Sequence, residues 1–177
     1  MQESKSMLEQ RAKIEIDPKY LSRITKEDAI FKVDAEGLYY RDLNTLLRQA
    51  IQADGIHQME IRNVCGQRYL GTDLETNIKI VIYGYPGNDL GAFMNGPTIE
   101  VHGNGQDGSG NTMNEGKIII HGHAGDVTGN SMRGGKIFVR DYVGYRVGIH
   151  MKEYQKKIPQ IVGLKPDPPS KSFHGLT

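Results

Sequence analysis

Apolar residues recur along the middle of the chain at a fixed spacing of 19 residues. The methionines show the spacing most clearly, since Met94, Met113, Met132 and Met151 follow one another at that interval. A glycine stands three residues before each methionine, and an Ile-x-(Val/Ile) pair begins five residues after each of the first three. Because several independent columns keep the same interval without an insertion, the sequence contains an internal repeat.

A unit of 19 residues is too short to bury an apolar face alone, so successive units must stack to form a core. The stacked coils would lie about 4.8 Å apart, the spacing of paired strands, and each apolar column would run down the interior. The sequence therefore predicts an all-β fold, a right-handed parallel β-helix over residues 57–158. A left-handed β-helix of hexapeptide repeats would require a six-residue period, which the sequence lacks.

Strand alternation divides each repeat into residues that point inward and residues that point outward. One outward position in each repeat is occupied by Val81, Glu100, Ile119 and Phe138 in turn. Three of these four are apolar, so we expect Val81, Ile119 and Phe138 to form an interface, covered either by another part of this chain or by a partner. Cover by this chain is the favoured interpretation, because the sequence also predicts an amphipathic helix.

That helix is predicted over residues 42–54, where apolar residues fall at helical spacing on one face. The residues of this face are Leu43, Leu46, Leu47, Ala50 and Ile51. Asp42 is the expected N-cap and Gly55 the expected residue after the C-terminus. We interpret residues 1–56 as a cap segment for the end of the solenoid, and the proline-rich residues 159–177 as an extended tail.

The charge balance and the hydropathy of the chain argue against nucleic-acid and membrane partners. The formal net charge is +1 and the charged fraction is 24%, so no strongly basic surface for nucleic acid is indicated. No apolar run approaches the length needed to span a bilayer, and the N-terminal MQESKSMLEQRAK has no apolar signal core. We therefore expect a cytoplasmic protein without nucleic-acid or membrane partners.

The single cysteine, Cys65, excludes a disulfide within the chain and a cluster ligated by several cysteines. It lies between apolar residues in EIRNVCGQ, so we interpret it as a small buried residue and not as a nucleophile. Lys117 and Lys136 form an outward basic column, which is more typical of a solvated solenoid edge than of a phosphate site.

Residues 103–108 match the dinucleotide-binding pattern G-x-G-x-x-G, with Asp126 at a suitable distance downstream. The pattern requires a helix after its last glycine, because the helix N-terminus holds the pyrophosphate. The segment that follows, SGNTMNEGKIIIHG, is a poor helix and a good next coil. Dinucleotide binding is therefore disfavoured.

Histidine and aspartate residues offer a second candidate chemistry. His102 and His121 should stack on adjacent coils, as should Asp107 and Asp126, and His123 lies two residues beyond His121. One interpretation is a metal site formed by this set. The favoured interpretation is a pair of polar ladders, in which the aspartates cap turn backbone and the histidines lie on the outer face.

Four segments carry a resemblance to a known family: GQRYLG, GNDLGAFMNG, QDGSGNTMNEGKIIIHGHAGD and SMRGGKIFVRDYVGYRVGIHMKEY. They closely resemble the glycine-repeat domain of glutamate synthase, and in particular its stand-alone form, the domain-3 subunit. The resemblance covers roughly residues 36–162. A related repeat occurs in the C subunit of formylmethanofuran dehydrogenase. After about Val162 the sequence departs from the family pattern, so we expect the last coil to be covered by the tail or by a partner.

The resemblance implies a right-handed parallel β-helix and a non-catalytic scaffold subunit of a glutamate-synthase-type oxidoreductase. It implies glutaminase-like and FMN-containing synthase-like partner subunits, with FMN and iron–sulfur clusters on those partners. No catalytic, cofactor-binding or metal-ligating residue is carried over to this chain. The alternatives are a component of a formylmethanofuran-type dehydrogenase and a metal-binding β-helix protein, and a homo-oligomer stays open.

Overall fold

The structure is a computed structural model that describes residues 18–52 and 55–163. Eight strands form one sheet in chain order, in which β1 and β2 are antiparallel and every later pair is parallel. The elements are η1 (Pro18–Arg23), β1 (Ile24–Glu27), β2 (Ile30–Asp34), α2 (Tyr40–Ile51), β3 (Gln58–Cys65), β4 (Lys79–Tyr85), β5 (Asn95–His102), β6 (Glu115–Ile120), β7 (Lys136–Val139) and β8 (Gln160–Gly163).

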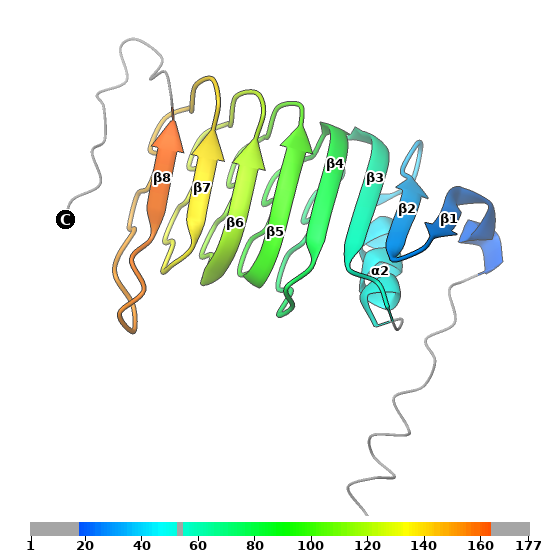
Figure 1. The fold of residues 1–177 in the computed structure, drawn as a ribbon. Helices are drawn as coiled ribbons and strands as arrows, with labels where there is room; N and C mark the ends of the chain where they lie inside the picture. The colour runs from blue at the N-terminus through cyan, green and yellow to red at the C-terminus, as the bar shows by residue number, and fades with distance from the viewer. Residues whose placement is uncertain (1–17, 53–54, 164–177) are drawn as a thin grey trace, which may run out of the picture.

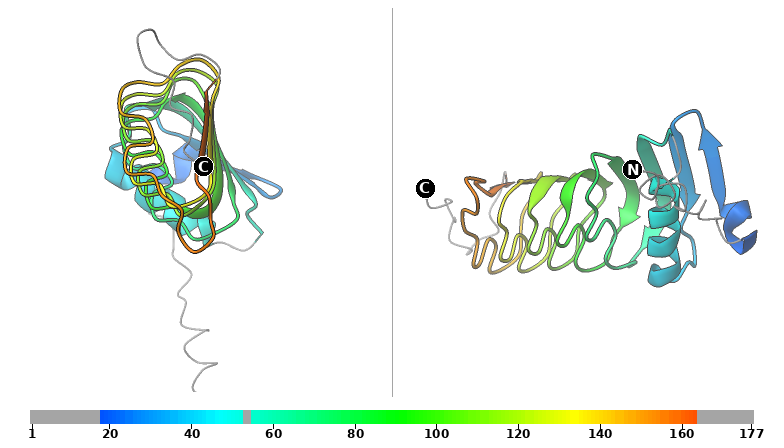
Figure 2. Two further views of the ribbon diagram at one scale, coloured as in Figure 1. Left: turned by 90° about the vertical axis from the view of Figure 1, so that its left-hand side faces the viewer. Right: turned by 90° about the horizontal axis from the view of Figure 1, so that it is seen from below.

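The chain winds as a solenoid, as the 19-residue period predicts, and the coils are right-handed, as expected for β crossovers in general. From β2 to β8 each strand runs up one wall, and the chain returns behind the sheet before the next strand begins (Figure 1). Seen end-on, the coils superimpose as a flattened tube with the sheet along one side (Figure 2). Neither described helix is long and apolar enough to cross a membrane.

The interior consists of apolar columns in which each residue stacks on its equivalent in the next coil. One column pairs Ile80, Ile99, Ile118, Ile137 and Ile161 in register through β4 to β8. The inward placement of the methionines is confirmed, because the side chains of Met94, Met113 and Met132 are fully buried. Burial of repeated columns supplies the core that no single coil has.

The glycine column before the methionines is a requirement of the backbone. Gly91, Gly110, Gly129 and Gly148 all have φ between +63° and +70°, the left-handed region that glycine enters without strain. At Gly110 a Cβ would also lie 2.4 Å from Cδ1 of Ile137 in the next coil. Gly110 is therefore needed both for its backbone conformation and for the close approach of coils.

Helix α2 closes the N-terminal end of the solenoid and does not cover the outward apolar positions. Its buried face is the predicted one, with Leu43, Leu46, Leu47 and Ala50 in the core. The helix lies behind β2 and β3, on the inner side of the sheet (Figures 1 and 2). The expectation that it covers the stripe of Val81, Ile119 and Phe138 is wrong, because the first coil has no preceding coil and its open core takes the helix.

The ends of α2 also differ from the prediction. The N-cap is Tyr39, without a side-chain capping hydrogen bond, and Asp42 lies inside the first turn. There its carboxylate faces the positive end of the helix dipole and does not cap it. The helix ends at Ile51 with Gln52 as C-cap, and residues 53–54 lie outside the described residues.

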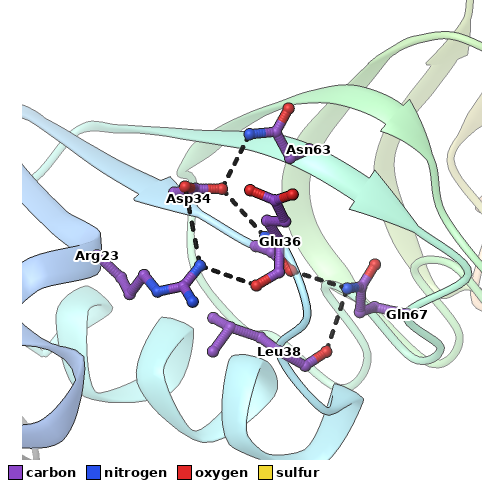
Figure 3. Close-up of polar contacts among 7 residues, drawn as sticks. Arg23, Asp34, Glu36, Leu38, Asn63 and Gln67 are labelled. Atoms are coloured by element: carbon purple, nitrogen blue, oxygen red, sulfur yellow. Dashed lines mark hydrogen bonds and ion pairs between the residues drawn. The ribbon is translucent and has the colours of Figure 1, made fainter.

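A polar network joins the segment between β2 and α2 to β3 and to the turn after it (Figure 3). The Asp34 carboxylate accepts hydrogen bonds of 3.0 Å from the Asn63 side chain and from the Glu36 backbone. Those bonds, led by the one from Asn63, lower the pKa of Asp34. Buried Gln67 donates to the carbonyls of Ala35 and Leu38, so the loop before α2 is held against the turn after β3.

The parallel sheet extends beyond residues 57–158 at both ends. Strand β2 pairs in parallel with β3, and β8 pairs with β7. Ile161 of β8 continues the isoleucine column, so the expected extended tail is wrong for residues 160–163. Residues 1–17 of the predicted cap and 164–177 of the predicted tail lie outside the described residues.

Cys65 is exposed, which corrects the expectation of burial. The ladder between β3 and β4 shifts its register between Ile61 and Val64, where Asn63 has a φ of +56°. The irregularity changes the strand alternation, so Val64 points into the core and Cys65 points out.

We predict that Met113→Asp strongly destabilises the fold, by more than about 4 kcal/mol, because it places a carboxylate in a dry interior column. Urea unfolding followed by circular dichroism measures the effect. The matched control is Ile158→Asp, which makes a similar change at a side chain that is 65% exposed. Equal stability of the two variants would contradict the burial of the methionine column.

Candidate functional site on the outer face of the sheet

The outward side chains of β4 to β7 form an outer face with three parallel columns. The middle column contains Val81, Glu100, Ile119 and Phe138, which pair in register from strand to strand. The flanking column on one side contains Lys79, Thr98, Lys117 and Lys136. The column on the other side begins with Tyr83 and His102, and His121 follows at the end of β6.

The three predicted interface residues are not equivalent. Val81 is only 5% exposed, so it offers little surface to a partner. Ile119 and Phe138 are partly exposed, and the paired Val162 of β8 continues them with 46% exposure. We call Ile119, Phe138 and Val162 the apolar strip, which occupies the C-terminal half of the outer face.

Two lysines border the apolar strip. Lys117 and Lys136 are exposed and lie opposite each other on β6 and β7, as the outward basic column predicts. Like charges on paired residues repel each other, and among the described residues no ion pair is recorded for either lysine. This border therefore favours an acidic group on whatever contacts the strip.

The N-terminal half of the outer face carries a polar cluster centred on Glu100. Its Oε1 lies 2.9 Å from Nε2 of His121 and 3.4 Å from Nε2 of His102. Its Oε2 lies 2.9 Å from Nζ of Lys79. One carboxylate thus connects residues of three successive coils, because adjacent coils place these side chains on neighbouring strands.

Ring stacking fixes the two histidines of this cluster. The His102 ring stacks between those of Tyr83 and His121, with centroids 4.9 and 4.7 Å away. The Arg62 guanidinium covers the Tyr83 ring at 4.4 Å. Parallel coils bring equivalent side chains into stacking distance, so the solenoid itself sets the ring orientation.

The surroundings of Glu100 favour its ionised form. The hydrogen bond from Lys79 is the main cause that lowers the pKa of Glu100, and the bond from His121 adds to it. Burial opposes the shift, since the carboxylate is only 19% exposed. The cluster therefore presents a fixed negative charge between basic and imidazole groups.

The aspartates proposed with the histidines do not join them. Asp107 Oδ1 accepts a 2.8 Å hydrogen bond from the backbone N–H of Asp126. Asp126 Oδ1 accepts an equal bond from the backbone N–H of Tyr145. These aspartates form the expected backbone-capping ladder, and His123 stacks on Tyr142 outside the cluster. A four-residue site of His102, His121, Asp107 and Asp126 is therefore wrong.

The G-x-G-x-x-G segment has a structural role in the packing of the coils. A Cβ at Gly103 would lie 2.1 Å from the carbonyl oxygen of Gly84, so this glycine permits close approach of two coils. Turns follow it and lead into β6, not into a helix. The helix N-terminus that would hold a pyrophosphate is therefore missing at this place.

Sequence reasoning missed the role of Glu100. It identified Glu100 as an outward residue but grouped it with the apolar positions of its column. The signal was the E-x-H spacing of Glu100 and His102, which places both on one face of a strand, with His121 one period later.

Comparison with known proteins identifies one family and one relative. The sequence model of a family described as GXGXG motif matches residues 53–163. An uncharacterized protein of Methanocaldococcus jannaschii is 52% identical over 132 residues, which cover 73% of this chain and 51% of that protein. The chain therefore spans about half the length of this relative. No solved structure matches the chain significantly.

We predict that Glu100→Gln lowers stability at pH 7 by about 1 kcal/mol, because it removes the charge that binds Lys79 and His121. A lowered folded-state pKa contributes stability above the unfolded pKa, and that stability is lost as the pH falls through the folded pKa. The difference between wild type and variant should therefore shrink toward pH 3 in urea titrations. A difference independent of pH would argue against an ionic role.

Proposed function

Because the chain belongs to the GXGXG motif family, that of the glycine-repeat domain of glutamate synthase, we propose that it is a non-catalytic scaffold subunit of a glutamate-synthase-type oxidoreductase. The match over residues 53–163 carries this proposal. In the proposed complex the chain links a glutaminase-like subunit and a synthase-like subunit. FMN and iron–sulfur clusters belong to the partners, and the process served is glutamate biosynthesis in nitrogen assimilation.

The mechanical properties of the solenoid support a scaffold role. Backbone hydrogen bonds join consecutive coils at many points besides the strands, for example from Gly110 to Leu90 and from Gly129 to Ser109. The isoleucine column is filled without interruption from β4 to β8. A rod with a continuous core holds its two ends at a set separation, which suits a part that positions two catalytic subunits.

The apolar strip is the docking surface that we assign to one of these partners. It combines partly exposed Ile119 and Phe138 with the exposed charges of Lys117 and Lys136. Such a surface fits a partner that presents an apolar side chain next to acidic groups. The glutaminase-like or synthase-like subunit should therefore carry an acidic, partly apolar patch.

The proposal is tested by co-expression with the glutaminase-like and synthase-like subunits of the same organism, followed by pull-down on a tag fused to this chain. Retention of both subunits is the expected result. A chain that binds neither subunit overturns the scaffold role. Retention of formylmethanofuran-dehydrogenase-type subunits in a parallel experiment would favour the related alternative.

We predict that Phe138→Asp weakens binding to the docked subunit by about 30-fold or more, the effect of removing an interface hot spot. The matched control is Phe93→Asp, which changes an exposed phenylalanine on the return wall, at a φ of +60° that aspartate tolerates. Titration calorimetry measures both variants. Equal binding by Phe138→Asp and wild type would exclude the apolar strip as the docking surface. The scaffold role would then still be decided by the pull-down result.

A further inference from the structure

We propose that Glu100, His102 and His121 form a binding site for a divalent transition-metal ion, for which Zn²⁺ is the best match. Two imidazole nitrogens and one carboxylate oxygen are ligands that Zn²⁺ binds in proteins. Their ligand atoms all lie within 4.8 Å of one another. This proposal concerns the polar cluster alone and does not depend on the scaffold role.

The two separations that involve Glu100 are close to those around a tetrahedral ion. Bonds of about 2.0–2.1 Å place two ligands of a tetrahedral metal roughly 3.3–3.4 Å apart. The distance of 3.4 Å between Glu100 Oε1 and His102 Nε2 matches that separation, and the 2.9 Å to His121 Nε2 is slightly shorter. The His102 and His121 rings lie nearly parallel, with 15° between their planes, so at least one ring must turn out of the stack for both nitrogens to point at the same ion.

The structure holds Glu100 and the two histidines side by side before any ion binds. Stacking against Tyr83 on one side and His121 on the other keeps His102 next to Glu100. Lys79 occupies Oε2 of Glu100, which leaves Oε1 directed at the histidines. Partners that orient a ligand in this way raise metal affinity, because less freedom is lost on binding.

The site is open on its outer side. The histidine side chains are 38% and 40% exposed, so an ion reaches them from solvent. Three protein ligands leave a fourth position of a tetrahedral ion for water or for a group from another molecule. The positive charge of Lys79 opposes a divalent cation, but Lys79 contacts Oε2 of Glu100, so Oε1 is left for the ion.

A comparison with His123 separates this site from an ordinary surface histidine. His123 also stacks on an aromatic ring of the next coil, with 4.6 Å between the centroids of its ring and that of Tyr142. Among the described residues, His123 belongs to no group of three or more His, Cys, Asp or Glu side chains that could hold a metal ion. His123 is thus stacked on an aromatic ring like the histidines of the cluster, but it is not part of a group of ligand atoms that lie close together.

The test is Zn²⁺ titration of the purified full chain, by calorimetry and by competition with a chromophoric chelator. The decisive variants are His121→Phe and His102→Phe, which keep a ring in the stack but remove the ligand nitrogen. His123→Phe is the matched control. Circular dichroism and thermal unfolding establish that each variant is folded.

The expected result is one Zn²⁺ per chain for wild type and for His123→Phe, with affinity reduced at least about tenfold in each decisive variant. Glu100→Gln should give a comparable loss. With Co²⁺ as probe, wild type should show the strong visible absorption of a four-coordinate ion. Absence of stoichiometric binding, or an equal affinity of His121→Phe and His123→Phe, overturns the proposal.

Discussion

The constraint on which the whole structure depends is that each coil must place the same kind of side chain at the same position as the coil before it. The isoleucine column of β4 to β8 shows the principle, since Ile99, Ile118 and Ile137 are each paired with isoleucines on both sides. The glycine column obeys the same rule, because a side chain at Gly110 would collide with Ile137 of the next coil. Burial, backbone pairing and turn conformation are thus satisfied together or not at all.

The same constraint organises the outer face. Equivalent outward residues stack whether or not they are buried, so chemistry there depends on what adjacent coils supply. Near β5 this brings Tyr83, His102 and His121 into one ring stack beside Glu100. Toward β8 it produces the apolar strip instead. One ladder therefore carries two surfaces of different character, which allows a polar cluster and a docking surface to coexist on one short sheet.

The fold could be predicted from the sequence because the repeat makes many positions report the same arrangement. The methionine and isoleucine columns predicted the solenoid and its inward residues, and the helical spacing of apolar residues predicted the buried face of α2. The wrong predictions concern features that the repeat does not determine. The irregularity at Asn63 reverses the expected burial of Cys65. The amphipathic pattern of α2 could not distinguish an open end of the core from a side wall. Glu100 was overlooked because its partners come from neighbouring coils.

The stacking of equivalent residues also limits how such a chain changes length. Between Ile99 and Ile118 or Ile118 and Ile137, removal of a single residue would move every later side chain to the wrong column. Removal of one complete 19-residue repeat would leave all columns aligned and would shorten the rod by about 4.8 Å. The extra residue between Gly71 and Gly91, which lie 20 apart, is accommodated in a turn and not in the ladder. The length of the solenoid can therefore change only by whole coils, through the gain or loss of a complete repeat.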